Sequence, residues 1–295
     1  MEYIVETDNL VKIYGLHKVV DNASIHVGRG EIYGLIGKNG AGKTTLMRLI
    51  LGLAGKTSGN IYLYGKDENE APRSKIGALV ESPALYKNET AFENMKRVAI
   101  LTPTSDEKLK ALLSVVKLDD TGKKKVKDFS LGMKQRLGIA MALVGDPDLL
   151  ILDEPINGLD PAGIKEMRDL ILTLNEKGVT FIISSHLLDE LGKIATTYGI
   201  INHGRIEEIS AEELKQKCKK HIRIVVDDTK KAKQIIESMD KKYEVEIVHN
   251  EIIIDNEIED SSKINAKLVT SGINVLEVDV ISMGLEDYFI ARLGE

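Results

Sequence analysis

The sequence predicts an α/β fold for about its first 210 residues, followed by a smaller α+β domain. Over the first two-thirds of the chain, short apolar or β-branched runs alternate with helical stretches, which is typical of an α/β domain. The composition then changes near Ser210, and the segment that follows has its own order of strands and helices. We therefore expect domains at residues 1–210 and 211–295.

The α/β domain begins with a clear strand, IYGLIG (residues 32–37), followed by a glycine turn and the helix KTTLMRLILGL (residues 43–53). LLILDEP (residues 149–155) and VTFIISSH (residues 179–186) predict further strands. They are rich in Leu, Ile and Val on both faces, as strands of a covered parallel sheet are. The three strands predict a core α/β sheet.

A helical subdomain is predicted at about residues 84–145, because this segment lacks strand signals. Its stretch DEKLKALLSVVKL places Leu109, Leu112, Leu113 and Val116 on one helical face. We expect this subdomain to be inserted between strands of the core sheet.

The C-terminal segment opens with the charged helical stretch EELKQKCKKH. The residues after it predict strands and helices in the order β-α-β-β-α-β. The two middle strands, YEVEIV and EIIID, form a hairpin about His249-Asn250, and the last strand, INVLEVDV, precedes the helix LEDYFIARLG. This order is that of a ferredoxin-like domain. We expect an accessory domain, and a regulatory domain that senses a ligand or sets the rate of the first domain's reaction is the alternative.

Composition excludes several classes of protein. The net charge of −6 argues against nucleic acid as the main partner. The single Cys218 rules out an internal disulfide and suits a reducing compartment. The N-terminal MEYIVETDNL lacks the apolar core of a signal peptide, and no apolar run is long enough to cross a membrane. We expect a cytoplasmic protein whose link to a membrane goes through another chain.

A phosphate-binding loop is predicted at GKNGAGKT, which matches G-x-x-x-x-G-K-[ST] between a strand and a helix. Its glycines let successive N–H groups point at phosphate oxygens, and Lys43 can reach the β- and γ-phosphates. The Thr44 hydroxyl is suited to Mg²⁺. The predicted nucleotide-binding residues of this loop are Gly37, Lys38, Asn39, Gly40, Ala41, Gly42, Lys43, Thr44 and Thr45.

Two carboxylates end the apolar strand LLILDEP, which is costly unless a cation lies beside them. Asp153 is predicted to hold Mg²⁺, and Glu154 to orient and deprotonate the attacking water. A second anion-binding motif, FSLGMKQR, places Ser130 and Gly132 at a predicted helix N-terminus, where free N–H groups and the helix dipole favour an anion.

Taken together, the motifs resemble the ATP-binding subunits of ABC transporters over about residues 2–208. GKNGAGKT, FSLGMKQR, LLILDEP, NGLD and SSH occur in that family's order. The resemblance implies an ABC cassette of the P-loop NTPase fold that closes as a head-to-tail homodimer around two ATP molecules, next to a separate membrane permease. It also implies ATP and Mg²⁺ as cofactors and a peripheral position on the inner face of the membrane.

The resemblance assigns further roles. Ser130 and Gly132 would grip the γ-phosphate of the partner's ATP, His186 would contact the γ-phosphate, and Asp160 would couple the two sites. Tyr14 would stack on adenine.

Two departures from the family pattern indicate which group of ABC transporters this chain resembles. The signature is FSLGM in place of LSGGQ, and Glu81 stands where the family usually has glutamine, a residue that senses the γ-phosphate and Mg²⁺. A carboxylate can still coordinate Mg²⁺ or its waters. Glu81, SLGMKQRLGIA and LEDYF together resemble the exporters that protect bacteria from bacitracin and lantibiotic peptides. Residues 83–93 would contact the permease.

Other functions remain open at this point. One is a soluble ABC ATPase that acts on ribosomes or DNA, although the chain has one set of motifs and an acidic balance. Another is a nucleotide-binding regulator without turnover. The altered signature and Glu81 favour it, and the presence of Asp153, Glu154 and His186 opposes it.

Overall fold

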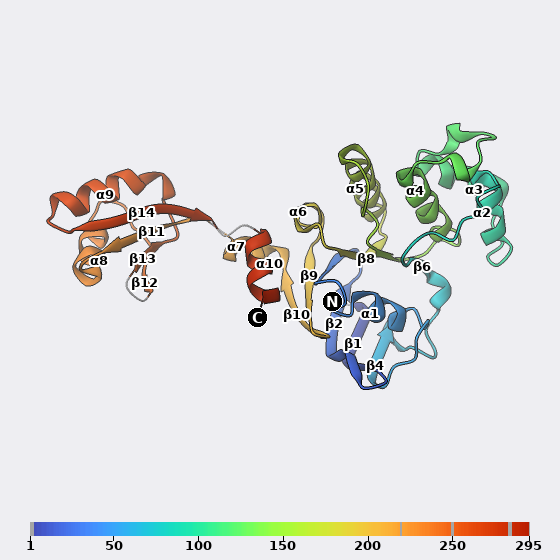
Figure 1. Ribbon diagram of the computed structural model, residues 1–295, viewed down its shortest axis with the longest axis horizontal. Coiled ribbons are helices and arrows are strands. Elements are labelled where there is room, and N and C mark those ends of the chain that lie inside the picture. Colours follow the sequence, from blue (N-terminus) through green and yellow to red (C-terminus); the bar gives the residue numbers. More distant parts are fainter. Residues whose placement is uncertain (1–2, 219, 249–250, 283–284, 295) are drawn as a thin grey trace. The chain divides into compact units, whose positions relative to one another are not determined.

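The computed structural model describes residues 3–218, 220–248, 251–282 and 285–294, which fall into two compact units (Figure 1). The first unit runs to Ala211 and resumes at Arg292, and the second runs from Glu212 to Ala291. Within the described residues, no helix is both long and apolar enough to cross a membrane.

An antiparallel sheet that the sequence analysis did not predict opens the first unit. Its strand order is β2-β1-β4-β5. The long strands β1 and β2 pair from Tyr3↔Gly28 to Tyr14↔His17, with bulges between, and turn at Gly15, whose φ is 59°. The four strands are β1 (Tyr3–Tyr14), β2 (His17–Gly28), β4 (Ser58–Leu63) and β5 (Lys66–Asp67).

The predicted α/β core is confirmed as a second sheet of order β10-β9-β3-β8-β7-β6. β3, β7 and β8 are buried along their whole length, as expected for parallel strands covered on both faces. β10 alone pairs antiparallel. The strands are β3 (Ile32–Ile36), β6 (Ile76–Leu79), β7 (Leu149–Asp153), β8 (Thr180–Ser185), β9 (Thr197–Asn202) and β10 (Arg205–Ser210).

Three helices follow strands of this sheet, and the predicted site motifs lie where strand and helix meet. They are α1 (Lys43–Ile50) after β3, α5 (Pro161–Glu176) after β7, and α6 (Leu188–Leu191) after β8. Leu46, Met47, Leu49 and Ile50 of α1 join one hydrophobic core with buried side chains from both sheets. Because each such side chain contributes roughly 1.5–3 kcal/mol when buried, this core fixes the position of the loop before α1.

A helical segment lies between β6 and β7, as predicted. It contains α2 (Ala91–Ala99), α3 (Asp106–Val115) and α4 (Leu131–Ala142), with 3₁₀ turns at Asp119–Thr121 and Val126–Asp128 between α3 and α4. Another 3₁₀ turn, Arg73–Lys75, precedes β6. The predicted apolar face of α3 is confirmed: Leu109, Leu113 and Val116 are buried, and Leu112 is half-buried.

The second unit has the predicted β-α-β-β-α-β order and a sheet of order β12-β13-β11-β14 with antiparallel neighbours. This is the ferredoxin-like arrangement, because each β-α-β unit leaves room for one strand between its own two. The predicted turn His249-Asn250 lies outside the described residues. The elements are α7 (Ala211–Lys217), β11 (Lys220–Val226), α8 (Thr229–Glu237), β12 (Val245–Val248), β13 (Glu251–Ile254), a 3₁₀ turn (Ile258–Asp260), α9 (Ser261–Thr270), β14 (Val275–Ser282) and α10 (Leu285–Gly294).

Candidate functional site

The loop between β3 and α1 curls so that its backbone faces a pocket. Gly42 caps α1 with φ 113°, a conformation that side chains rarely permit. A Cβ at this position would lie 2.6 Å from the Val19 carbonyl oxygen. No side chain caps α1, so the first N–H groups of the helix remain available to an anion in the pocket.

Lys43, the first residue of α1, is buried, with 7% of its surface exposed. Its ammonium group donates a hydrogen bond to the Gly37 carbonyl oxygen at 2.7 Å and lies 3.8 Å from the Glu154 carboxylate. The lysine is therefore held across the loop, where a phosphate group entering the pocket would meet a desolvated positive charge.

Asp153, at the end of β7, joins three elements. Its carboxylate accepts hydrogen bonds from the Thr44 hydroxyl at 2.8 Å and the Ser184 hydroxyl at 2.5 Å. Asp153 is only 4% exposed, so these contacts offset part of the cost of burying a carboxylate. The arrangement brings two of the predicted Mg²⁺ ligands, Thr44 and Asp153, into direct contact.

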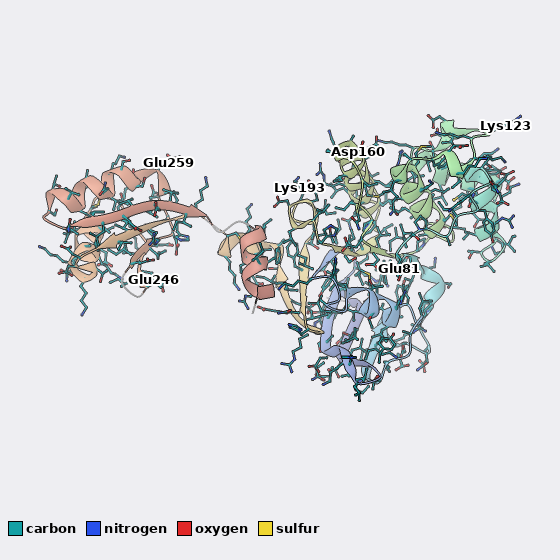
Figure 2. The ribbon with its side chains drawn as sticks, viewed as in Figure 1. Glu81, Lys123, Asp160, Lys193, Glu246 and Glu259 are labelled. Atoms are coloured by element: carbon teal, nitrogen blue, oxygen red, sulfur yellow. The ribbon has the colours of Figure 1, made fainter. Side chains whose placement is uncertain are left out.

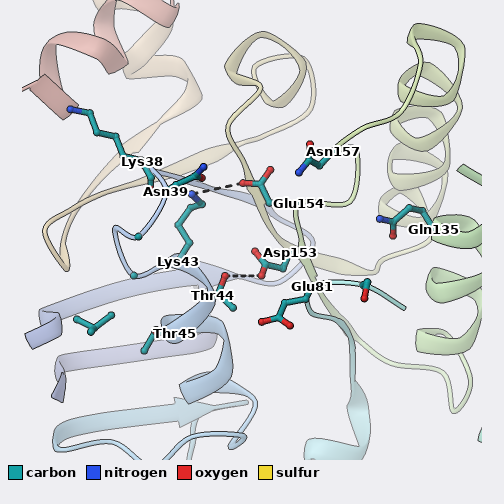
Figure 3. A pocket seen from close by; sticks show the side chains of 14 residues that line it. Lys38, Asn39, Lys43, Thr44, Thr45, Glu81, Gln135, Asp153, Glu154 and Asn157 are labelled. Atoms are coloured by element: carbon teal, nitrogen blue, oxygen red, sulfur yellow. Dashed lines mark hydrogen bonds and ion pairs between the residues drawn. The ribbon is translucent and has the colours of Figure 1, made fainter. Parts of the chain in front are cut away.

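Glu154 follows in a left-handed backbone conformation with φ 51°. Its backbone N–H donates to the Ser184 hydroxyl at 2.9 Å, and its carboxylate lies 2.7 Å from His186 Nδ1. The left-handed turn directs the carboxylate away from the strand and toward the pocket (Figure 3). The two predicted catalytic residues, Glu154 and His186, therefore form one hydrogen-bonded pair.

These side chains surround a pocket of about 570 Å³ (Figure 3). The phosphate loop forms one wall, and the ends of β6 and β7 with α4 form the opposite wall. The lining residues are Val19, Lys38, Asn39, Gly40, Gly42, Lys43, Thr44, Thr45, Glu81, Ser82, Gln135, Asp153, Glu154 and Asn157. Gly37 and Ala41 belong to the same loop but do not line the pocket.

The donors present fit a magnesium ion in part. The Thr44 hydroxyl and the Asp153 carboxylate are hard oxygen ligands of the kind Mg²⁺ takes, and Mg²⁺ usually keeps several waters and phosphate oxygens besides. Across the residues that the structure describes, no group of three or more His, Cys, Asp or Glu side chains could hold a metal alone. A cation here would therefore depend on a nucleotide for further ligands.

Glu81, the third predicted metal ligand, lines the same pocket after β6 (Figure 2), but its carboxylate pairs with the Arg48 guanidinium. Both side chains are largely exposed, at 63% for Glu81 and 43% for Arg48. Glu81 also has a positive φ of 65°. The structure thus places the Glu81 carboxylate at the edge of the site, where the Arg48 guanidinium would compete with a metal ion for it.

Ser130, Gly132 and Asp160 do not line this pocket. Ser130 is the N-cap of α4, accepting a hydrogen bond from the Met133 N–H at 3.2 Å. Asp160 is the N-cap of α5 and accepts one from the Gly163 N–H at 2.9 Å (Figure 2). A Cβ at Gly132 would meet nothing nearer than a Leu159 methyl at 3.7 Å. Both caps are exposed.

Tyr14 ends β1 and is 47% exposed. The Lys12 ammonium lies 4.6 Å from the centroid of its ring. Tyr14 does not line the pocket, so its predicted stacking role stays a prediction.

Five side chains of the site were not predicted as such. Ser184, on β8, donates to the Asp153 carboxylate and accepts from the Glu154 backbone N–H. Four others line the pocket: Val19, Ser82, Gln135 and Asn157. Ser184, Gln135 and Asn157 lie within the motifs SSH, FSLGMKQR and NGLD. A glutamine on the otherwise apolar buried face of α4 is the signal that could have drawn attention to Gln135.

Comparison with known proteins identifies close relatives. A family model described as "ABC transporter" matches residues 20–157. The bacitracin transport ATP-binding protein BcrA of Enterococcus faecalis is 41% identical over 100% of this chain and 97% of its own length. The lantibiotic transport ATP-binding protein SrtF of Streptococcus pyogenes is 45% identical over 69% of this chain and 89% of its own length.

Solved structures of ATP-binding cassettes share the fold of the first unit. A nucleotide-free ATP-binding cassette from an ABC transporter superposes with a TM-score of 0.66 at 29% identity, covering 72% of this chain and 93% of that one. The ADP conformation of MJ1267, an ATP-binding cassette of an ABC transporter, gives the same TM-score and coverage at 28% identity.

Proposed function

The chain belongs to the ATP-binding proteins of ABC transporters, and from this premise we propose that it hydrolyses ATP to power an exporter of antimicrobial peptides. The observation that carries the enzymatic part is the Glu154–His186 pair, 2.7 Å apart, at the edge of a pocket that also contains a phosphate loop. A carboxylate fixed by its backbone and by a histidine is placed to act as a general base.

In the proposed reaction, the Glu154 carboxylate takes a proton from the water that attacks the terminal phosphorus of ATP. The bond between that phosphorus and its bridging oxygen breaks, giving ADP and phosphate. Lys43 and the N–H groups at the start of α1 hold the phosphate chain. Thr44 and Asp153 would hold Mg²⁺, which neutralises charge on the phosphates.

We propose that Ser130, Gly132 and Asp160 act on the nucleotide of a second copy. None of the three lines its own pocket, and Ser130 and Asp160 are exposed. Both observations support this assignment, since an exposed helix N-terminus can receive an anion from outside. The active form would be an ATP-dependent homodimer.

The export role rests on the relatives, two of which carry bacitracin and lantibiotic transport in their names. We propose that this chain works with a separate membrane permease at the inner face of the membrane. Residues 83–93, which follow Glu81 and lead into α2, would contact that permease. Residues 212–291 would form an accessory domain.

The enzymatic proposal is tested with Glu154→Gln, which keeps the shape of the side chain and removes the base. We expect ATP turnover to fall at least about a hundredfold, the scale of a lost general base, while ATP binding is kept. With Mg²⁺ and ATP the variant should sediment as a dimer. Glu176→Gln, at the exposed end of α5, is the matched control.

Two results would contradict the enzymatic proposal. Undiminished turnover in Glu154→Gln would remove Glu154 from catalysis. A variant that binds ATP yet stays monomeric would contradict the homodimer for the isolated subunit.

The export proposal is tested with a susceptibility panel on cells that lack this protein. The panel includes bacitracin, several lantibiotics and unrelated drugs, with wild-type or Glu154→Gln protein restored. Sensitivity to one peptide class, rescued only by the wild type, is expected. A flat panel would overturn the peptide substrate and leave the ATPase assignment standing.

A further inference from the structure

Gln135 is a buried polar side chain without an assigned role. It lies in α4, one and a half turns after Ser130, and 6% of its surface is exposed. Its Oε1 atom is fully buried and has no hydrogen-bond partner among the described residues. Leaving a buried amide oxygen unpaired costs free energy, and such exceptions usually have a functional explanation.

The side chain extends from α4 toward the nucleotide pocket, which it lines (Figure 3). On that side the pocket is otherwise acidic, because Glu81, Asp153 and Glu154 line it. The neutral polar side chains on the same wall are Ser82, Asn157 and Gln135. A phosphate group reaching this wall would be repelled by the carboxylates, whereas an amide N–H₂ group can donate to it.

Packing does not require an amide at this position. One turn along the same face, α4 comes close to the loop after β6: a Cβ at Gly138 would lie 2.8 Å from the Pro83 Cβ. This contact keeps Gln135 beside the pocket. An apolar side chain of similar length would fill the space without an unpaired oxygen. The terminal torsion of glutamine is broad, so the amide can turn either of its polar atoms to a ligand.

We propose that the Gln135 amide contacts the terminal phosphate group of ATP and thereby distinguishes ATP from ADP. The cost of the unpaired Oε1 atom is offset when the N–H₂ group of the same amide donates to that phosphate. ATP reaches the acidic wall with its third phosphate, whose oxygens accept from the amide N–H₂ group, and ADP, one phosphate shorter, gives that group no acceptor. This inference rests on the proposed ATPase function and adds a specificity-determining contact to it.

The test compares Gln135→Met, which keeps the length and removes the amide, with Leu137→Met, a control that is buried in the same helix but outside the pocket. Binding of Mg²⁺ with either AMP-PNP, whose terminal bond resists hydrolysis, or ADP is measured on the full chain. We expect Gln135→Met to weaken AMP-PNP binding about tenfold and to leave ADP binding within about twofold. The thermal midpoint without nucleotide should stay equal or rise.

Gln135→Glu supplies a second measurement, because it places a carboxylate where the amide donor stood. This variant should lose more AMP-PNP affinity than Gln135→Met, with a smaller effect on ADP. If the Gln135 variants lost equal affinity for AMP-PNP and ADP, or lost none for either, the proposed contact would be overturned. Wild-type protein that binds no AMP-PNP would overturn the proposed function itself, whereas normal wild-type binding with an unaffected Gln135→Met would overturn this inference alone.

Discussion

Two carboxylates of the nucleotide pocket occupy the left-handed backbone region, which residues other than glycine adopt uncommonly. At Glu154 the contacts that compensate are clear: the backbone N–H is bound by Ser184 and the carboxylate by His186. At Glu81 the partner of the carboxylate is Arg48, in an ion pair whose two members are largely exposed. Glu154, the proposed base, is therefore held through both its backbone and its side chain, whereas the side chain of Glu81 is held by an exposed ion pair.

Arg48→Met tests whether this ion pair competes with a cation for Glu81. Exposed ion pairs contribute about 0–1 kcal/mol, so the thermal midpoint should change little. The freed carboxylate should become available to Mg²⁺, lowering the Mg²⁺ concentration that gives half-maximal ATP turnover. Glu81→Gln added to Arg48→Met should abolish that shift. An unchanged Mg²⁺ dependence in Arg48→Met would contradict competition.

Much of the site could be predicted at the level of residues because its parts are consecutive in the chain. The phosphate loop and the carboxylates that end β7 follow from local patterns of glycine, charge and buried strand. Ser82 and Gln135 line the same pocket because α4 packs against the loop after β6, and no local pattern contains that packing. Ser184 was missed for the same reason, since strand pairing brings it beside Asp153.

At the scale of elements, the packing of β3 against β9 depends on a tyrosine on β3 and a glycine on β9. Tyr33 is fully buried and donates a hydrogen bond to the Glu208 carboxylate at 2.9 Å. Its ring lies over Gly199, where a Cβ would be 2.2 Å from the phenol oxygen. Burial, with the Glu208 charge, raises the pKa of the Tyr33 phenol well above its usual value. The glycine is therefore required for the tyrosine to pack.

Gly199→Ala should destabilise the first unit by about 1–3 kcal/mol or more, as expected for an overpacked core. Tyr33→Phe in the same chain removes the nearest atom and should restore part of the loss. Urea unfolding monitored by circular dichroism measures both. An alanine variant with wild-type stability would show that β9 can move away from β3 without cost.

In the second unit, Asp260 anchors the start of α9. It accepts hydrogen bonds from Lys263 at 2.7 Å, Lys241 at 2.8 Å and the Tyr243 hydroxyl at 3.2 Å. The two lysines lower the pKa of this carboxyl from 3.8 to about 2. A lowered pKa stabilises the folded state above pH 3.8, and the stabilisation is lost as the pH falls toward 2.

Asp260→Asn should therefore speed hydrogen exchange in α9 at about pH 6, because the lysines lose their anionic partner. The difference from the wild type should shrink as the pH falls from about 4 to about 2, where the wild-type carboxyl is itself neutralised. Mass spectrometry of α9 peptides measures both, with exposed Asp240→Asn as control. A difference that is constant with pH would rule out the charge as the cause.

Elements with a strong internal pattern could be predicted, and those defined by pairing could not. The buried strands β3, β7 and β8 are continuous apolar runs, and α3 shows its apolar face in the spacing of its leucines. The antiparallel strands β1, β2 and β4 contain charged and polar residues, and β1 and β2 pair with several bulges. Bulges break the two-residue alternation on which strand prediction depends.

At the scale of the whole molecule, every predicted site residue belongs to the first unit, including Glu154 and His186. Replacing residues 219–284 with a short glycine-serine linker, while keeping α10, should therefore leave the first unit folded. ATP turnover should remain within about threefold of the wild type, because no group that contacts the nucleotide is removed. Calorimetry and phosphate release measure the two effects. A large loss of turnover would indicate a regulatory role for the second unit.

The return of the chain to the first unit at Arg292 has a consequence for truncated products. The Arg292 guanidinium pairs with Glu207 of β10 at 2.8 Å, and β10 is the last strand of its sheet. An outer strand with free backbone groups is a template for pairing with another molecule. A chain that stops before Arg292 keeps its catalytic groups yet loses this ion pair on β10. Premature termination would therefore be harmful through self-association rather than through lost chemistry.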